Sequence, residues 1–191
     1  MRTSILALCL LASASCFAKG KPVSHTVSVA RYGVKGDGTT VNTRAFNKAV
    51  EKTPEGDTLL IPAGKYITGT IHLKSHMTIV LQPGAEIIAN ADLADYDHYR
   101  PTKDMKRYDT GAGTVNANLT GDANWTKALI LGQNLEDVTI TGEGVIDGQH
   151  LEDPQGEESM RGPHTIIIAE SDNIRLEGFK LRHASNYAVL G

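Results

Sequence analysis

The chain has 191 residues, a formal net charge of −3 and a charged fraction of 21%. That balance is ordinary for a globular protein, and it excludes the strongly basic surface on which nucleic-acid-binding proteins rely. The 19 glycines and an aromatic fraction of only 5% indicate many tight turns, in a chain long enough for one domain with a substantial core.

The first 18 residues have the pattern of an export signal. Arg2 precedes an apolar run from Ile5 to Ala14, and small residues follow as far as Ala18. The run is too short for a stable transmembrane helix. We therefore expect a signal peptide over residues 1–18, cut after Ala14 or Ala18, and a secreted or periplasmic protein without a transmembrane segment.

Both cysteines of the chain, Cys9 and Cys16, lie within that segment. A mature chain that begins after Ala18 would contain neither, which excludes disulfides, thiol nucleophiles and cysteine metal sites. A lipid anchor on Cys16 is a weaker alternative, because residues 13–15 lack the large apolar residue that usually opens a lipidation signal.

A glycine-rich turn and one amphipathic helix open the mature chain. The segment "YGVKGDG" is followed by Asn42, a residue type that favours helix starts. Apolar residues recur at positions 45, 46, 49 and 50, which lie on one helical stripe. This pattern predicts a helix from about Asn42 to Lys52 that ends before Pro54.

Short strands separated by turns follow the helix. The expected strands are Thr58–Ile61, Tyr66–Leu73, Met77–Leu81 and Glu86–Ala89, with Pro-Ala-Gly, Lys-Ser-His and Gln-Pro-Gly turns between them. Strand character returns over residues 128–148 and 164–191. Residues about 90–126 and about 149–163 are polar and have little period, so we expect two excursions from the main body there.

Two of the later segments are copies of one another. "NLEDVTITGEGVI" and "ESDNIRLEGFKL" align at a constant offset of 36 residues. The matched pairs are Val138 with Ile174, Ile140 with Leu176, Gly142 with Gly178, and Val145 with Leu181; a looser third copy is formed by Met77, Ile79 and Leu81. Such repeats, with Asn, Asp and Gly at the corners, favour an all-β solenoid, the parallel β-helix, over the jelly roll or sandwich that short strands also permit.

The lone helix has a defined place in such a solenoid. The end of a β-helix exposes its core and its strand edges, so an atypical terminal element must cover them. The helix of residues about 42–52 lies directly ahead of the first strands, and we expect its apolar stripe to cap the N-terminal end of the stack. The alternative is a surface helix packed on some other sheet.

These motifs resemble a known family. "YGVKGDGTTVNTRAFNKAVE", the "GDTLLIPAGKYITGTIHLKSHMTIVLQPGAEIIA" that follows closely and the later "ITGEGVIDGQ" are similar to the N-terminal region of glycoside hydrolase family 28. These are the polygalacturonase-like proteins of the pectin-lyase-like β-helix superfamily. The resemblance implies a right-handed parallel β-helix, with residues 19–191 as the N-terminal part of a single domain. It also implies an inverting hydrolase with a pectic polysaccharide as its partner and no cofactor.

The residues that would carry out this hydrolysis are not evident in the chain. Inverting hydrolysis needs a carboxylic acid and a carboxylate about 6.5–9.5 Å apart. The family's Asn-Thr-Asp, Asp-Asp, Gly-His-Gly and Arg-x-Lys motifs do not occur in the sequence. We therefore expect an N-terminal fragment that is inactive alone, with its catalytic residues beyond Gly191. A calcium-dependent, pectate-lyase-like enzyme and a non-catalytic carbohydrate-binding or adhesive β-helix are the alternatives.

Three residues of the last segment match family positions near the floor of the substrate cleft, namely His183, Asn186 and Tyr187. The resemblance implies that they bind substrate, and burial in the core is the alternative. Asp147 could face the same cleft or, as Asp before Gly often does, fix a turn through its own backbone.

The first excursion combines tyrosines with cations, which could bind an anionic sugar or simply belong to a loop folded against the β-helix. These residues are Tyr96, Tyr99, Arg100, Lys103, Lys106, Arg107 and Tyr108. Asp92, Asp95 and Asp97 lack the spacing of a calcium-binding EF-hand loop, and the seven histidines lack ligand spacing, so we expect no metal site.

Overall fold

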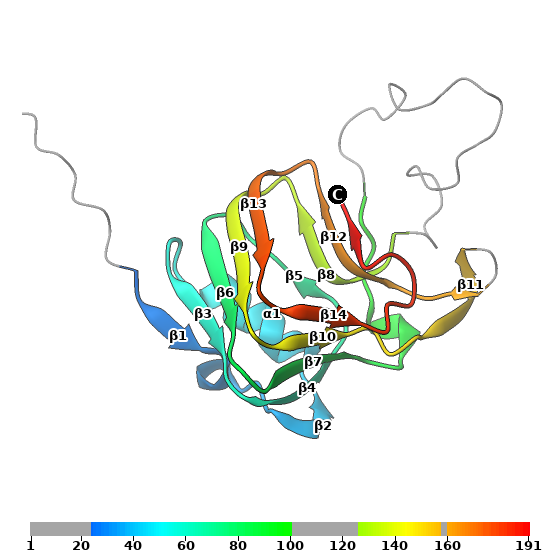
Figure 1. The fold of residues 1–191 in the computed structure, drawn as a ribbon, viewed down its shortest axis with the longest axis horizontal. Coiled ribbons are helices and arrows are strands. Elements are labelled where there is room, and N and C mark those ends of the chain that lie inside the picture. The colour runs from blue at the N-terminus through cyan, green and yellow to red at the C-terminus, as the bar shows by residue number, and fades with distance from the viewer. Residues whose placement is uncertain (1–23, 101–125, 158–159) are drawn as a thin grey trace, which may run out of the picture.

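The structure is a computed structural model that describes residues 24–100, 126–157 and 160–191. The expected signal peptide and both cysteines lie outside the described residues. Within them the chain winds through three parallel sheets that form a right-handed β-helix (Figure 1). The expected fold class is therefore confirmed.

Each sheet takes one strand from each successive coil. The first sheet contains, in spatial order, β1 (Thr26–Ser28), β3 (Thr58–Ile61), β6 (Met77–Leu81), β9 (Glu136–Gly142) and β13 (Asp172–Glu177). The second contains β2 (Asp37–Val41), β4 (Gly64–Thr68), β7 (Ala85–Ala89), β10 (Val145–Asp147) and β14 (Lys180–Arg182). The third contains β5 (Ile71–His72), β8 (Ala128–Gln133), β12 (His164–Ala169) and β15 (Val189–Leu190). Short 3₁₀ turns occur at η1 (Val29–Tyr32) and η2 (Leu93–Asp95).

The predicted repeat is a physical stack of side chains. In the first sheet Val138 pairs with Ile174 and Ile140 with Leu176, as the 36-residue offset requires, and Ile79 pairs with Ile140. Successive residues of a strand face opposite sides, so these in-register apolar residues meet inside the coil. The offset changes after the corner, because Val145 pairs with Lys180 rather than with Leu181. The earlier coil has one more residue than the later one between its corner glycine and its next strand.

The chain uses a left-handed backbone conformation just before, or at the second residue of, four strands of the first sheet. Four residues have φ between 54° and 81°, namely Gly56, His76, Asp137 and Asn173. Each lies two residues before a member of one cross-strand row, which consists of Thr58, Thr78, Thr139 and Arg175 on β3, β6, β9 and β13. Glycine adopts this conformation without strain, and Asn, Asp and His tolerate it better than most residues do. The Asn, Asp and Gly corners noticed in the sequence therefore mark the bends of the solenoid.

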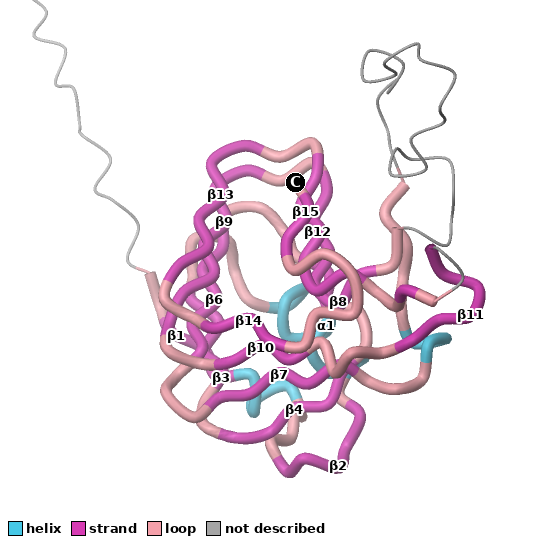
Figure 2. The backbone as a smooth tube through the Cα atoms, turned by 45° about the vertical axis from the view of Figure 1, so that its right-hand side comes forward, coloured by secondary structure: helices cyan, strands magenta, loops and turns pink. Residues whose placement is uncertain are grey.

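The single α-helix, α1 (Thr43–Lys52), covers the N-terminal opening of the coils (Figure 2). Phe46, Ala49 and Val50 are buried, and the ring of Phe46 meets that of Tyr66 edge-on at a centroid distance of 5.8 Å. The expected capping arrangement is therefore present, and the helix limits match the prediction closely. Asn42 occupies the N-cap position, but its side chain makes no capping hydrogen bond to the helix.

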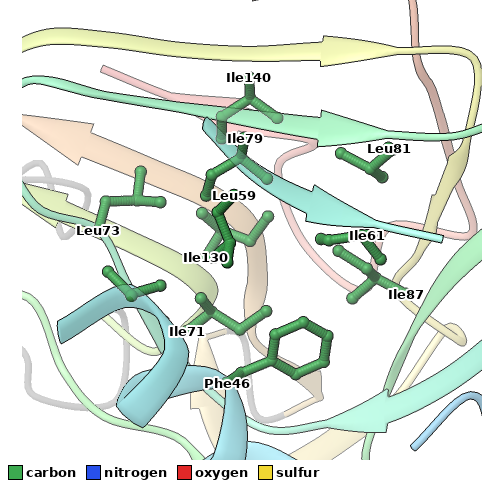
Figure 3. A pocket seen from close by; sticks show the side chains of 11 residues that line it. Phe46, Leu59, Ile61, Ile71, Leu73, Ile79, Leu81, Ile87, Ile130 and Ile140 are labelled. Carbon is green, nitrogen blue, oxygen red and sulfur yellow. The ribbon is translucent and has the colours of Figure 1, made fainter. Parts of the chain in front are cut away.

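The interior under this helix is packed core. A small apolar void of about 10 Å³ lies between α1 and the strands (Figure 3). Its lining consists of Phe46, Val50, Leu59, Ile61, Ile71, Leu73, Ile79, Leu81, Ile87, Ile130 and Ile140. A void of this size with apolar walls has no polar group to hold a water or a ligand.

One expected strand is divided. Residues 66–73 were predicted as continuous, but β4 ends at Thr68 and β5 begins at Ile71. At the bend the Gly69 N–H donates to Thr43 Oγ1 at 2.7 Å and the Thr70 N–H donates to the Asp95 carbonyl at 3.0 Å. A Cβ at Gly69 would lie 2.0 Å from that carbonyl oxygen, so this bend requires glycine.

Candidate functional site

The two excursions leave the β-helix at the same corner. The first lies between β7 and β8, and the second, which contains β11 (Glu152–Glu157), lies between β10 and β12. In the last coil the shorter loop of residues 183–188 lies between β14 and β15. The described parts of these insertions gather on one side of the solenoid (Figure 1). Repeat proteins often place their binding surfaces on such a face.

Asp147 lies at the centre of this corner. It ends β10, where the preceding Ile146 faces the core, so strand alternation directs Asp147 to the outer face of the second sheet. The residue is nevertheless only 1% exposed. Its Oδ1 accepts a hydrogen bond from the Gln149 backbone N–H at 2.9 Å, and its Oδ2 accepts one from Arg182 Nε at 2.7 Å. Asp147 therefore does fix a turn through its own backbone, as Asp before Gly often does.

The surroundings of Asp147 keep it ionised. Burial alone would raise the pKa of its carboxyl group, but hydrogen bonds from the Gln149 backbone, Arg182 and His183 outweigh burial and leave that pKa below its ordinary value. A carboxyl group that is ionised at neutral pH cannot donate a proton as a general acid. Asp147 is therefore suited to hold cationic side chains rather than to protonate a leaving group.

His183 is one of the side chains that Asp147 holds. Its Nδ1 lies 3.0 Å from Asp147 Oδ1 and 3.2 Å from Oδ2, and its carbonyl accepts a hydrogen bond from the His150 N–H at 2.9 Å. The rings of His150 and His183 lie 5.0 Å apart between centroids. The side chain of His183 is 49% exposed, so it is not part of the core.

Arg182 is the other side chain held by Asp147. It crosses the outer face of the second sheet, where its Nη2 donates to Glu86 Oε1 on β7 while its Nε donates to Asp147 on β10. Its side chain is 47% exposed. The guanidinium is thus fixed by two carboxylates on neighbouring strands, with nearly half of its surface open to solvent.

Asn186 and Tyr187 lie in the same loop as His183. The Tyr187 ring stacks on His164 with a centroid distance of 5.7 Å and an interplanar angle of 4°, and the residue is 42% exposed. The Tyr187 carbonyl accepts a hydrogen bond from the Thr165 N–H at 3.1 Å, whereas Asn186 Oδ1 accepts one from the Tyr187 N–H at 3.0 Å. The three residues proposed from the sequence therefore share one partly exposed loop, and their contact with substrate stays a prediction.

A buried ion pair lies among the insertions. Lys127 Nζ donates to Asp153 Oδ2 at 2.8 Å, and both side chains are largely buried. Burial would raise the pKa of Asp153, but the hydrogen bond from Lys127 outweighs it and the pKa lies below its ordinary value. Asp153 is thus satisfied by its partner and is not a poised acid.

The described tyrosines of the first excursion face the protein. Tyr96 and Tyr99 are 4% and 8% exposed, and Tyr99 packs with Leu131 and Ile167 over the outer face of the third sheet. Burial raises the pKa of Tyr99 to about 12. Neither ring is available to stack on a sugar, so this part of the excursion folds against the β-helix. The cations and the tyrosine at positions 103–108 lie outside the described residues.

The three aspartates of this excursion, which lack EF-hand spacing, are also engaged in contacts within the protein. Asp95 Oδ2 accepts hydrogen bonds from Thr43 Oγ1 at 2.5 Å and from Asn90 Nδ2 at 3.0 Å. Asp92 accepts from the Ala94 N–H, and Asp97 pairs with a histidine at 2.7 Å. In the part of the chain that the structure describes, no group of three or more His, Cys, Asp or Glu residues is placed to hold a metal ion, and no helix is long and apolar enough to cross a membrane.

Sequence reasoning did not select Arg182 or His150 as site residues. Arg182 precedes His183 and His150 follows Asp147 by three residues, but the contacts of Arg182 with Asp147 and of His150 with His183 join neighbouring coils. Asp147 pairs with Arg182 in the ladder, and this pairing rests on a register that the constant 36-residue offset misses by one. The 36-residue offset pairs Asp147 with His183 instead, the residue after Arg182.

Comparison with known proteins places this chain in a family. Residues 26–112 match the family described as "Rhamnogalacturonase A/epimerase, pectate lyase-like". The chain is 36% identical over 176 residues to the "Probable polygalacturonase" of Vitis vinifera, an alignment that covers 87% of this chain and 34% of the relative. It is 35% identical over 155 residues to the "Exo-poly-alpha-D-galacturonosidase" of Dickeya chrysanthemi, covering 81% of this chain and 24% of the relative.

The chain belongs to the polygalacturonase-like family of pectate-lyase-like β-helix proteins. It spans about a third of the length of the Vitis relative and about a quarter of that of the Dickeya relative. The family 28 exopolygalacturonase of Yersinia enterocolitica has the same fold, with a TM-score of 0.63 at 22% identity over 88% of this chain and 36% of that one. These findings confirm the family resemblance noted in the sequence.

Proposed function

We propose that the protein of which this polygalacturonase-like chain is part hydrolyses pectic polysaccharide with inversion at the cleaved sugar. The observation that carries the proposal is the identity of 36% and 35% to two relatives whose names describe galacturonic-acid-releasing enzymes, along most of this chain. The parallel β-helix and its loop-rich corner are compatible with an extended polymer that lies across several coils. The protein would be exported by the signal peptide expected at residues 1–18.

We assign no catalytic carboxylate within the 191 residues. The motifs that supply the acid and the base in the family do not occur in the sequence. Asp147 and Asp153 are tied to Arg182 and Lys127, and both have lowered pKa values, which makes neither suitable as a general acid. The proposed contribution of this chain is the capped scaffold and the residues His183, Asn186 and Tyr187, which would contact the substrate.

The test uses the complete reading frame that contains this chain. The purified product is incubated with polygalacturonate, and new reducing ends, the ultraviolet absorbance of unsaturated products and the anomeric configuration of the first product are measured. Hydrolysis with inversion yields reducing ends of the opposite anomeric form and no unsaturated sugar. The 191-residue chain alone is the control and should release no sugar.

Two outcomes would contradict the proposal and support the alternatives. Unsaturated products that disappear after a chelator is added would indicate a calcium-dependent lyase, in keeping with the pectate-lyase-like description of the matched family. Binding to polygalacturonate without any turnover by the complete protein would indicate a carbohydrate-binding or adhesive β-helix.

A further inference from the structure

The corner around Asp147 also contains an arginine and two histidines with unused hydrogen-bonding capacity. Among the described residues, Arg182 makes side-chain hydrogen bonds through Nε and Nη2 but not through Nη1, and His183 makes them through Nδ1 but not through Nε2. The side chain of His150 is exposed and its ring contacts that of His183, while its backbone N–H donates to the His183 carbonyl. Three side chains from two neighbouring coils therefore present nitrogen atoms to solvent at one place, and the imidazole Nε2 of His183 becomes a donor when its ring is protonated.

We propose that Arg182, His183 and His150 form a binding site for a carboxylate of an acidic polysaccharide, with Asp147 as the buried residue that positions the first two. The proposal rests on the proposed function for the choice of polymer, and it adds residues and a mechanism of binding. A guanidinium and an imidazolium are suited to a carboxylate because both give charge-assisted hydrogen bonds.

Asp147 provides the fixed geometry that such a site needs. Its carboxylate is 1% exposed and contacts both Arg182 and His183, so it orients the two side chains without meeting solvent itself. Because its oxygens lie against Nδ1 of His183, they favour the proton on Nδ1 and direct Nε2 outward. A site held on strands β10 and β14 loses less rotational freedom on binding than cations on a free loop would.

The charge balance makes this site dependent on pH. The groups packed together are the carboxylates of Glu86 and Asp147, the guanidinium of Arg182, and the imidazoles of His150 and His183. Lys65 and Lys180 lie in the same row as Glu86 across β4, β7, β10 and β14, and protonation of either imidazole adds one positive charge to this group. A polyanion should therefore bind more tightly on the acidic side of neutrality, and added salt should weaken binding.

The test measures binding of the full-length protein to polygalacturonate by affinity electrophoresis, with neutral galactan as the uncharged comparison. Arg182→Gln should weaken binding to polygalacturonate by about 5- to 10-fold at pH about 5 and leave galactan binding unchanged. His183→Asn, which tolerates the left-handed backbone at φ 51°, should weaken binding by about 3-fold or more at that pH and by less than about 2-fold near pH 8. Arg175→Gln removes an exposed arginine from the first sheet and should have no effect.

The variant Asp147→Asn tests whether Asp147 positions Arg182 and His183 or only repels a polyanion. If Asp147 acts only as a nearby negative charge, its removal should tighten binding to a polyanion. If it positions Arg182 and His183, the variant should bind polygalacturonate more weakly than the wild-type protein does. Thermal melts of each variant should show folded protein, since unfolding would weaken binding at every pH alike.

The outcomes distinguish this inference from the proposed function. Cleavage of polygalacturonate together with wild-type binding by Arg182→Gln and His183→Asn would overturn the site and keep the hydrolase. Weakened binding by those variants in a protein that never cleaves polygalacturonate would keep the site and overturn the hydrolase. Tighter binding by Asp147→Asn would overturn its positioning role.

Discussion

At the scale of single residues, Asp147 combines a structural and a binding role. The hydrogen bond to the Gln149 backbone closes the turn after β10, and the contacts with Arg182 and His183 join the last two coils. Each contact prefers the ionised carboxyl group, which is why its pKa lies below the ordinary value despite burial.

The lowered pKa of Asp147 predicts how its contribution to the free energy of unfolding changes with pH. A carboxyl group whose pKa falls on folding stabilises the folded state above its unfolded pKa of about 3.9, and that contribution is lost as the pH falls through the folded pKa. Asp147→Asn should therefore lower the free energy of unfolding by about 1–2 kcal/mol at pH about 7, and by less than that below pH about 4.

Urea unfolding of the 191-residue chain at the two pH values measures this difference. Asp172→Asn is the matched control, because Asp172 is an exposed residue of β13 and its substitution should change the unfolding free energy by less than about 0.5 kcal/mol. An equal loss for Asp147→Asn at both pH values would show that the charge of Asp147 contributes nothing.

At the scale of elements, helix α1 is both the N-terminal cap and an anchor for the first excursion. Thr43 at its start donates to Asp95 and accepts from the Gly69 N–H, while Asn47 donates to the Thr70 carbonyl at 2.8 Å. Asn42, expected as an N-cap, instead binds the backbone of the preceding turn, where its Oδ1 accepts from the Lys35 N–H at 2.8 Å. The helix is therefore held by tertiary hydrogen bonds as well as by its apolar stripe.

The capping role of α1 can be tested at Phe46, which is 1% exposed. Phe46→Ala would leave a cavity between α1 and the strands and should lower the free energy of unfolding by about 3–5 kcal/mol. Lys48→Ala, on the exposed face of the same helix, should change it by less than about 0.5 kcal/mol. Chemical denaturation of both variants measures the difference, and similar losses would show that α1 does not seal the core.

At the scale of the whole molecule, the coils form a nearly one-dimensional stack. Each coil contacts mainly its neighbours through in-register ladders, such as the row Ile79, Ile140 and Leu176 across β6, β9 and β13. In such an array stability depends on the interfaces between neighbouring units. Residues with a partner on both sides should therefore contribute more than residues with one.

This ladder gives a direct comparison in the 191-residue chain. Ile140 is 1% exposed between two neighbours, whereas Leu176 is only partly buried. Ile140→Ala should cost about 3–4 kcal/mol of unfolding free energy and Leu176→Ala about 1–2 kcal/mol. Denaturant titration of the two variants measures these losses. A greater loss for Leu176→Ala would contradict a stack whose stability comes from neighbouring coils.

Much of the fold could be predicted because β-helix rules are local or periodic. The amphipathic stripe of α1, the strands β3 and β6, and the pairing of Val138 with Ile174 follow from residue spacing. The prediction of a continuous strand over residues 66–73 was wrong. The bend at Gly69 and Thr70 depends on contacts with Thr43 and Asp95, which are distant in the sequence.

The candidate site could be predicted only in part. The family resemblance pointed to the loop of His183, Asn186 and Tyr187, and the Asp-Gly pattern pointed to the turn at Asp147. The roles of Arg182 and His150 were missed because they arise from the register between coils and from ring packing across a loop. Spacing along one chain segment carries no information on either.

Apolar periodicity and corner residues act over a few positions, so the amino-acid sequence alone predicts the class of fold, its N-terminal cap and the repeat. Which charges meet depends on how the coils stack. The exact register of β10 on β14 places Arg182 beside Asp147, and hydrogen bonds from the Gln149 backbone, Arg182 and His183 keep that carboxyl group ionised despite its burial. Electrostatic and hydrogen-bonding partners are chosen by distance in space, so the chemistry of the corner appears only once the coils are stacked.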